Sequence, residues 1–260
     1  MLLEGKRAIV TGGSRGIGRG ISLELARQGC DVVINYHSEA DHGFARDSAA
    51  DEIVAEIEAL GRKAIALEGN IGDPAVSTAL VQAAIGNFGG VDILASNAGI
   101  CPFHSFLDMP PALLQQVVDV NLNGAFYICQ AAANRMKDQG KGGAIIATSS
   151  ISALVGGAMQ THYTPTKAGV HSLMQSAAIA LGPYGIRCNS VIPGAIATDI
   201  NKTDWSDPEK RAYLDKRIPL GRFGTPADVA SVVAFLASDM AAYVTGAALL
   251  VDGGLFVNLQ

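Results

Sequence analysis

The chain has little of what marks several large classes of protein. Only 17% of its 260 residues are charged, whereas 49% are hydrophobic, which excludes intrinsic disorder. The net charge of -5 offers no basic surface, so nucleic acid is excluded as the expected partner. The longest apolar runs, Val229–Ser238 and Ala241–Val251, are about half the length that a membrane-spanning helix needs. We therefore expect no membrane association.

Cysteine and histidine are also scarce, and their spacing fits neither a disulfide framework nor a metal site. No CxxC pair occurs among the four cysteines, which are Cys30, Cys101, Cys129 and Cys188. The five histidines lack HxxxH and HExxH spacing, so no metal is expected. The first residues lack the ordered charged and apolar regions of a signal peptide. These features predict a soluble, reduced, cytoplasmic protein.

Short apolar runs alternate with longer helical patterns along the chain. Seven runs have strand length and are almost continuously apolar, as in a sheet covered on both faces: Arg7–Val10, Asp31–Asn35, Lys63–Leu67, Asp92–Ser96, Ala144–Thr148, Arg187–Ile192 and Ala247–Val251. Helical patterns lie between them: Gly18–Gln28, Asp51–Leu60, Ala75–Asn87, Pro111–Lys137, Pro165–Leu181 and Pro226–Ser238. The alternation predicts an α/β fold with a doubly wound, parallel, seven-stranded sheet in a single domain over residues 1–260. The polar stretch 37–48 is expected to be a long surface loop.

A glycine-rich segment, Thr11–Gly18, directly follows the first predicted strand. Glycines allow a sharp turn and a close approach of the backbone to a pyrophosphate, whose charge then lies at the positive end of the following helix. The spacing is TGxxxGxG, one residue longer than GxGxxG, and by itself it fits a simple tight turn equally well. Its position between the first strand and the first helix favours a Rossmann-type dinucleotide site.

The end of the second predicted strand bears on the choice of nicotinamide cofactor. Sites selective for NAD usually place an acidic residue there, but this strand ends in Tyr36, His37 and Ser38. Arg15 of the glycine loop has the geometry to pair with a 2′-phosphate, although a surface arginine without a ligand is the alternative. NADP is therefore the favoured cofactor, and NAD is the second candidate.

Tyr163 and Lys167 lie one helical turn apart, near the start of a predicted helix that Pro165 opens. A tyrosine with a pKa of about 10 is a poor base at neutral pH, and a neighbouring ammonium lowers that pKa. YxxxK alone is common and also describes a half-buried aromatic ring beside a surface lysine. Ser150, which follows the predicted strand Ala144–Thr148, adds a hydroxyl at the edge of the sheet where sites form.

Taken together, these motifs resemble the short-chain dehydrogenase/reductase family over nearly the whole chain. The matching segments are Thr11–Gly18, Ser96–Gly99, Val120–Gly124, Ser150, Tyr163 with Lys167, Pro193–Gly194 and Val251–Gly254. The family's Asn-Asn-Ala-Gly appears here with Ser96 in place of the first asparagine, a change that bears on local hydrogen bonding more than on chemistry.

The resemblance implies a role for each catalytic candidate. Tyr163 would be the general acid/base, and Ser150 would hold the substrate oxygen. Lys167 would bind the nicotinamide ribose and lower the pKa of Tyr163, while Asn121 would support a water in the proton relay. The implied cofactor contacts are Gly12, Ser14, Arg15, Gly16, Ile17, Gly18, Tyr36, His37, Ser38, Asn70, Ile71, Asn97, Ala98, Gly99, Tyr163, Lys167, Pro193, Gly194, Ile196 and Thr198.

Within the family, the loops that flank the site are similar to those of bacterial dehydrogenases that oxidise L-rhamnose at C1. The similar segments are Gly99–Pro110, Ser149–Lys167, Ala197–Lys202 and Asp252–Gln260. The resemblance implies loss of the C1 hydroxyl proton to Tyr163 and of hydride to NADP or NAD, which gives an aldonolactone without a metal. One departure, Ala195 where those enzymes tend to carry threonine, bears on sugar preference. The substrate candidates are Phe103, His104, Ser150, Ser152, Gln160, Tyr163 and Ala195.

Other functions and the state of assembly stay open at this point. A 3-ketoacyl thioester reductase, another sugar or polyol dehydrogenase, and a catalytically silent nucleotide sensor share the same motifs. The final unit, Pro226–Val251, and the apolar tail, Gly254–Gln260, predict an interface, and the resemblance implies a homotetramer. The alternative for the tail is that it folds back over its own active-site edge.

Overall fold

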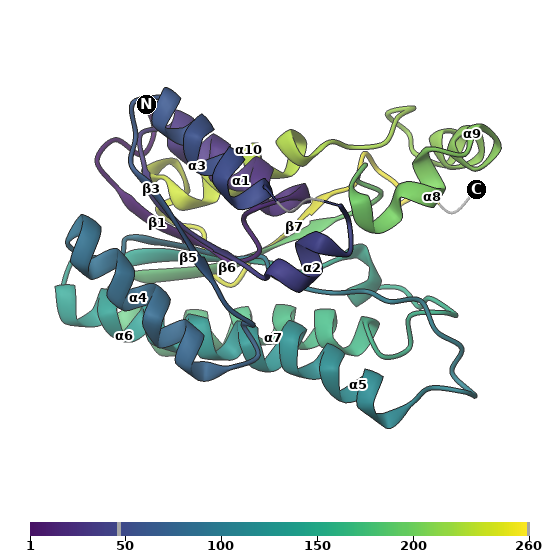
Figure 1. Cartoon of the computed structure of the whole chain (residues 1–260), viewed down its shortest axis with the longest axis horizontal. Helices are drawn as coiled ribbons and strands as arrows, with labels where there is room; N and C mark the ends of the chain where they lie inside the picture. Colours follow the sequence, from purple (N-terminus) through teal and green to yellow (C-terminus); the bar gives the residue numbers. More distant parts are fainter. Residues whose placement is uncertain (46–47, 259–260) are drawn as a thin grey trace.

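Seven parallel strands form the centre of the computed structural model, which describes residues 1–45 and 48–258 (Figure 1). The strands are β1 (Arg7–Val10), β2 (Asp31–Tyr36), β3 (Ala64–Glu68), β4 (Ile93–Ser96), β5 (Gly143–Thr148), β6 (Ile186–Pro193) and β7 (Ala248–Val251). Their order is β3-β2-β1-β4-β5-β6-β7, and every neighbouring pair is parallel. The loops after β1 and β4 lead away in opposite directions and leave a crevice at the carboxyl edge. The predicted doubly wound sheet is confirmed.

Helices cover both faces of the sheet, as Figure 1 shows. One face carries α1 (Gly16–Arg27), α3 (Ala49–Ala59) and α10 (Pro226–Ala237), and the other carries α4 (Pro74–Phe88), α6 (Gly124–Gln139) and α7 (Thr164–Leu181). Successive strand residues point to opposite faces, so Val10 packs with the first set of helices and Ile9 with the second. The inner strands β1, β4 and β5 are almost wholly buried and mostly apolar, as expected for a sheet covered on both faces, whereas the edge strands β3 and β7 are partly exposed.

The predicted helix Pro111–Lys137 is wrong as one continuous element. It consists of α5 (Pro111–Val118), a π-helical turn at Asp119–Asn123, and α6. Asn121 lies in this turn, where its side chain accepts a hydrogen bond from the Ile100 backbone N–H at 2.8 Å and donates to the Ile100 carbonyl at 2.9 Å. These long-range bonds hold the turn, and no periodicity in the sequence signals them.

The polar stretch 37–48, predicted to be a loop, contains the short helix α2 (Ser38–His42), while residues 46 and 47 lie outside the described residues. Two further helices, α8 (Lys202–Trp205) and α9 (Pro208–Arg217), were not predicted. Asp207 caps α9 by accepting hydrogen bonds from two backbone N–H groups of its first turn. Short 3₁₀ turns complete the structure at Ile151–Ala153, Gly182–Tyr184, Asp199–Asn201 and Asp239–Ala241. None of the described helices has the length and apolar character that spanning a membrane requires.

Candidate active site

The crevice at the carboxyl edge of the sheet holds a cavity of about 740 Å³. Loops from both halves of the sheet line it, so residues far apart in the sequence face one space. Most of the predicted site residues lie on its wall: Gly12, Ser14, Arg15, Gly16, Ile17, Gly18, Tyr36, His37, Asn70, Ile71, Asn97, Ala98, Gly99, Phe103, Ser150, Ser152, Gln160, Tyr163, Lys167, Pro193, Gly194, Ala195, Ile196 and Thr198.

Three predicted site residues are not part of the cavity wall. Ser38 begins α2 and donates a hydrogen bond to Glu68 on β3. His104 lies in the loop after β4, with Nδ1 3.0 Å from the carbonyl oxygen of the next residue. Asn121 is buried, and its amide is taken up by the backbone of Ile100 and by the Thr166 hydroxyl. In this structure Asn121 therefore ties the π-helical turn to the loop after β4.

The glycine loop fits a dinucleotide pyrophosphate. Gly12 and Gly16 adopt positive φ values of 60° and 55°, which side chains disfavour. A Cβ at Gly18 would collide with the Gly12 carbonyl oxygen, so only glycine allows this close packing of α1 against the loop. The N-terminus of α1 has no side-chain cap and no acidic residue in its first turn. Its backbone N–H groups and positive dipole end thus remain suited to a phosphate.

Charged side chains surround the far end of this loop. The Arg15 Nε donates to Asp41 Oδ1 at 3.0 Å, and its guanidinium lies 4.1 Å from the centre of the Phe44 ring. Asp41 and Glu39 both come from α2 and line the cavity. Sequence reasoning missed these carboxylates because it treated the segment as a solvated loop. Arg15 therefore has a carboxylate partner within the chain and lies on the cavity wall.

Tyr163, Ser150 and Lys167 meet at the opposite end, between the end of β5 and the first turn of α7. The Lys167 side chain is buried, and its Nζ donates to the Thr148 carbonyl oxygen at 2.9 Å. The same Nζ lies 5.7 Å from the centre of the Tyr163 ring. The lysine thus extends beneath the tyrosine rather than into solvent.

Burial controls the ionisation of both groups. Burial raises the pKa of Tyr163 above its ordinary value, the nearby Cys101 raises it further, and the hydrogen bond with Ser150 lowers it. Burial also lowers the pKa of Lys167 to about 8. In this structure the pKa of Tyr163 is therefore shifted upward rather than downward, because desolvation outweighs the lowering by the Ser150 hydrogen bond.

Beyond the tyrosine, polar side chains form a short hydrogen-bonded chain. Gln160 Nε2 donates to Cys101 Sγ at 3.2 Å, and the Ser152 hydroxyl donates to Gln160 Oε1 at 3.4 Å. Phe103 stands nearby with 52% of its surface exposed. Sequence reasoning named the other three residues but missed Cys101, which it treated only as a cysteine without a partner.

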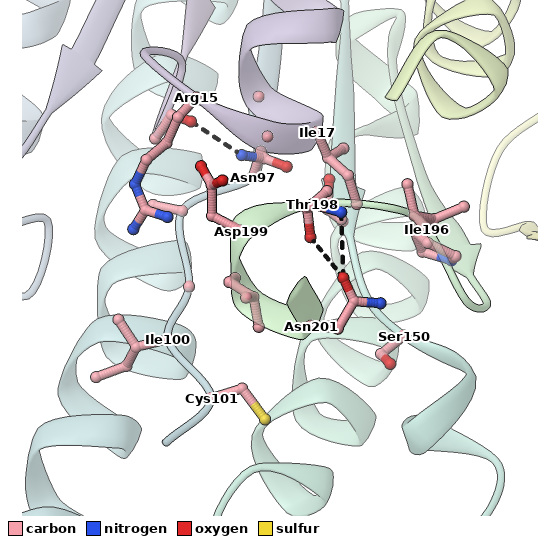
Figure 2. Close-up of a pocket in the computed structure, with 18 of the residues that line it drawn as sticks. Arg15, Ile17, Asn97, Ile100, Cys101, Ser150, Ile196, Thr198, Asp199 and Asn201 are labelled. Atoms are coloured by element: carbon pink, nitrogen blue, oxygen red, sulfur yellow. Dashed lines mark hydrogen bonds between the residues drawn. The ribbon is translucent and has the colours of Figure 1, made fainter. Parts of the chain in front are cut away.

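The segment after β6 also lines the cavity. In Figure 2, Thr198 and Asn201 are joined by two hydrogen bonds, each 3.1 Å long, which run from the Thr198 backbone N–H and hydroxyl to Asn201 Oδ1. Figure 2 also shows Asp199 between this turn and Arg15, with Ser150 and Cys101 further along the cavity. Sequence reasoning missed Asp199 and Asn201, although both lie within three residues of Thr198.

The C-terminal tail also reaches this cavity. Leu255 lies on its wall, and the Asn258 side chain donates to the Arg217 carbonyl oxygen of α9 at 2.9 Å. The tail therefore folds back along its own active-site edge, the alternative considered from the sequence, although Val257 remains 71% exposed. Leu259 and Gln260 of the predicted tail lie outside the described residues.

A glycine turn at the switch point of the sheet, with a serine, a tyrosine and a lysine across the same cavity, defines a dinucleotide-dependent dehydrogenase. The chain belongs to the short-chain dehydrogenase/reductase family. A family model described as enoyl-(acyl carrier protein) reductase matches residues 12–256. The family predicted from the motifs is confirmed.

Relatives extend over the full chain. The chain is 65% identical to the L-rhamnose 1-dehydrogenase (NAD(P)(+)) of Azotobacter vinelandii, with 100% of both chains covered. It is 61% identical to the protein of the same name from Sphingomonas sp. (strain SKA58), with 100% of this chain and 99% of that one covered. Among solved structures, a short-chain type dehydrogenase/reductase from Mycobacterium marinum is 36% identical, with a TM-score of 0.88 over 97% of this chain and 96% of that one.

Proposed function

We propose that this chain oxidises C1 of L-rhamnose, or of a closely related pyranose, to the aldonolactone, with NADP or NAD as cofactor. The observation that carries the proposal is the full-length identity of 65% and 61% to two proteins named L-rhamnose 1-dehydrogenase (NAD(P)(+)). The cavity supports it, because a dinucleotide cradle and an acid–base cluster open into the same space.

The residues at the catalytic end have separate roles in the reaction. Ser150 donates a hydrogen bond to the C1 oxygen, and Tyr163, acting as the phenolate, accepts the C1 hydroxyl proton as that oxygen becomes a carbonyl. When bound, the oxidised nicotinamide supplies a hydride acceptor and a positive charge. Lys167 adds its own positive charge beneath the Tyr163 ring, anchored on the Thr148 carbonyl. Lys167 is buried, whereas Tyr163 is half-buried and faces the cavity, where it can meet the C1 hydroxyl.

The charges on the cavity wall favour a neutral substrate. Four carboxylates line the cavity, whereas Arg15 and Lys167 are the arginine and lysine on its described wall; the carboxylates are Glu39, Asp41, Asp199 and Asp204. An acyl thioester on a phosphate-bearing carrier would bring further negative charge toward them. A sugar instead offers hydroxyls to Gln160 and Ser152, with Phe103 available for an apolar face or a methyl group. This favours the sugar over the 3-ketoacyl thioester alternative.

We also propose that the enzyme is a cytoplasmic homotetramer. The segment from α10 to β7 leaves apolar side chains exposed, including Met240 in the connecting 3₁₀ turn at 68% and Leu250 on β7 at 40%. A patch of this kind usually marks an interface between subunits. The four cysteines are all unpaired, as in a reducing compartment. Light scattering is expected to give about four times the chain mass of 26.8 kDa, and an active monomer would contradict the tetramer.

A panel of aldoses, each tested with NADP and NAD by the absorbance of the reduced cofactor, tests the proposed function. L-Rhamnose is expected to be among the best substrates, and its 6-methyl-bearing relatives should follow. Ala195→Thr should change the order of the sugars, because position 195 lies on the cavity wall. A 3-ketoacyl thioester reduced faster than any sugar is oxidised would overturn the assignment, and absence of all turnover would favour the nucleotide sensor.

A further inference from the structure

We propose that Asp41 sets the cofactor preference by balancing the charge of Arg15, so that the site accepts both NAD and NADP instead of selecting NADP. This inference rests on the proposed use of these cofactors. It concerns one end of the cavity only, where α2 meets the glycine loop. Asp41 would act through Arg15 as a specificity-determining residue.

The geometry of the pair supports this role. Asp41 is 4% exposed, which is unusual for a carboxylate, and its Oδ1 accepts from the Arg15 Nε at 3.0 Å. Phe44 packs on the face of the same guanidinium. The ring and the carboxylate thus fix the plane of Arg15, whose side chain stays 17% exposed beside the cavity.

Charge is what separates the two cofactors. NADP differs from NAD by a 2′-phosphate that carries close to two negative charges at neutral pH. An unopposed Arg15 would attract that phosphate and favour NADP strongly. The pair with Asp41 has no net charge, and Glu39 adds a second carboxylate to the same stretch of wall.

A neighbouring group reports the negative field. Burial raises the pKa of Tyr36 at the end of β2, and Glu68, Asp51 and Asp41 raise it further by their charge. Carboxylates therefore act on this end of the cavity from α2, α3 and β3. The 2′-phosphate is attracted by Arg15 and repelled by these carboxylates. The binding free energies of NADP and NAD therefore differ little.

The test is the dissociation constant of each oxidised cofactor, measured by calorimetry with the full chain and without sugar. Asp41→Asn is expected to bind NADP at least about fivefold more tightly, which is the size of effect expected from removing one nearby charge. Its binding of NAD should change by less than about twofold. Asp41→Ala should shift the ratio in the same direction. Arg15→Ala should weaken the binding of NADP about tenfold and leave the binding of NAD nearly unchanged.

Glu58→Gln is the matched control, because it removes the same charge from the exposed surface of α3, away from the cavity. It should leave both constants unchanged. The inference is overturned if the Asp41 variants bind NADP more weakly relative to NAD, which would mean that Asp41 only positions Arg15. It is also overturned if the ratio of the two dissociation constants does not change. If Asp41 variants do not fold, equal losses of NADP and NAD in Arg15→Ala still overturn it. A wild-type chain that binds neither cofactor would instead refute the proposed function.

Discussion

The two ends of the cavity are built on different physical principles. At the catalytic end, the half-buried Tyr163 and the buried Lys167 lie within one helical turn of each other, and desolvation is the largest influence on both pKa values. At the opposite end, Arg15 meets Asp41 across 26 residues of sequence in an ion pair between a partly exposed guanidinium and a buried carboxylate. The reacting groups are thus tuned by removal from water, whereas the recognition of the cofactor is tuned by the balance of charges.

This difference separates reactivity from selectivity. A buried group changes its proton affinity strongly when its surroundings change, so the catalytic end tolerates few substitutions. The Arg15–Asp41 pair lies at the other end of the cavity from the reacting groups, so its replacement should shift cofactor preference without stopping turnover. Variants at the catalytic end should therefore cause large losses of kcat or changes in KM. Variants at the cofactor end should cause smaller changes in the dissociation constants of the cofactors.

The largest effect is expected from Tyr163→Phe. Loss of the phenol removes the proton acceptor, so kcat should fall by at least two to three orders of magnitude, the scale of a lost general base. Calorimetry should show cofactor binding close to that of the wild type. Tyr184→Phe, at an exposed ring beside Lys137, is the control and should keep full activity. More than a tenth of the wild-type rate in Tyr163→Phe would contradict the role.

Lys167→Met tests whether burial governs the catalytic end. The pKa of Lys167 is lowered from 10.5 to about 8, so between these pH values the unfolded chain holds a proton that the folded chain has released. The stability of the wild type relative to Lys167→Met should therefore increase as pH rises from about 8 to about 10.5. Thermal or urea unfolding of both proteins without cofactor, at matched pH steps, measures the difference. A difference that stays flat or falls over this window would show that the lysine is not desolvated.

Gln160→Ala tests whether the catalytic end of the cavity, rather than the cofactor end, binds the sugar. Its amide is held between Ser152 and Cys101, so truncation should raise the KM for the sugar about tenfold, as expected for one lost hydrogen bond. The cofactor dissociation constants should stay the same. Gln115→Ala, exposed on α5, is the matched control. If Gln160→Ala alters cofactor affinity and leaves KM unchanged, the residue does not face the sugar.

The smallest effect is expected from Thr225→Ala, a position outside both ends of the cavity. Thr225 caps the N-terminus of α10 in a capping box with Asp228, and its loss should destabilise the fold by about 1 kcal/mol. For a chain of this size that lowers Tm by about 2–4 °C, with kcat unchanged. Differential scanning calorimetry measures it. A loss of activity as large as that of Gln160→Ala would mean that the helix start and the site are coupled.

The sequence predicts the parts of this molecule whose information is local. Each strand is a short apolar run, the glycine loop is contiguous, and Tyr163 and Lys167 are four positions apart, so the sheet and the positions of these residues on its edge follow from pattern and spacing. The charge partner of Arg15 and the π-helical turn at Asn121 depend on contacts between distant segments. Burial likewise reverses the expected direction of the Tyr163 pKa shift, because desolvation is a property of the folded chain.

The most direct test of the whole account uses L-rhamnose that carries deuterium at C1. With NADP, the account predicts that the deuterium appears in the reduced cofactor, that the product is the 1,5- or 1,4-lactone, and that Tyr163→Phe abolishes both signals. Mass spectrometry of the cofactor and NMR of the product measure them. Reduced cofactor without deuterium, or a product oxidised at another carbon, would contradict C1 oxidation.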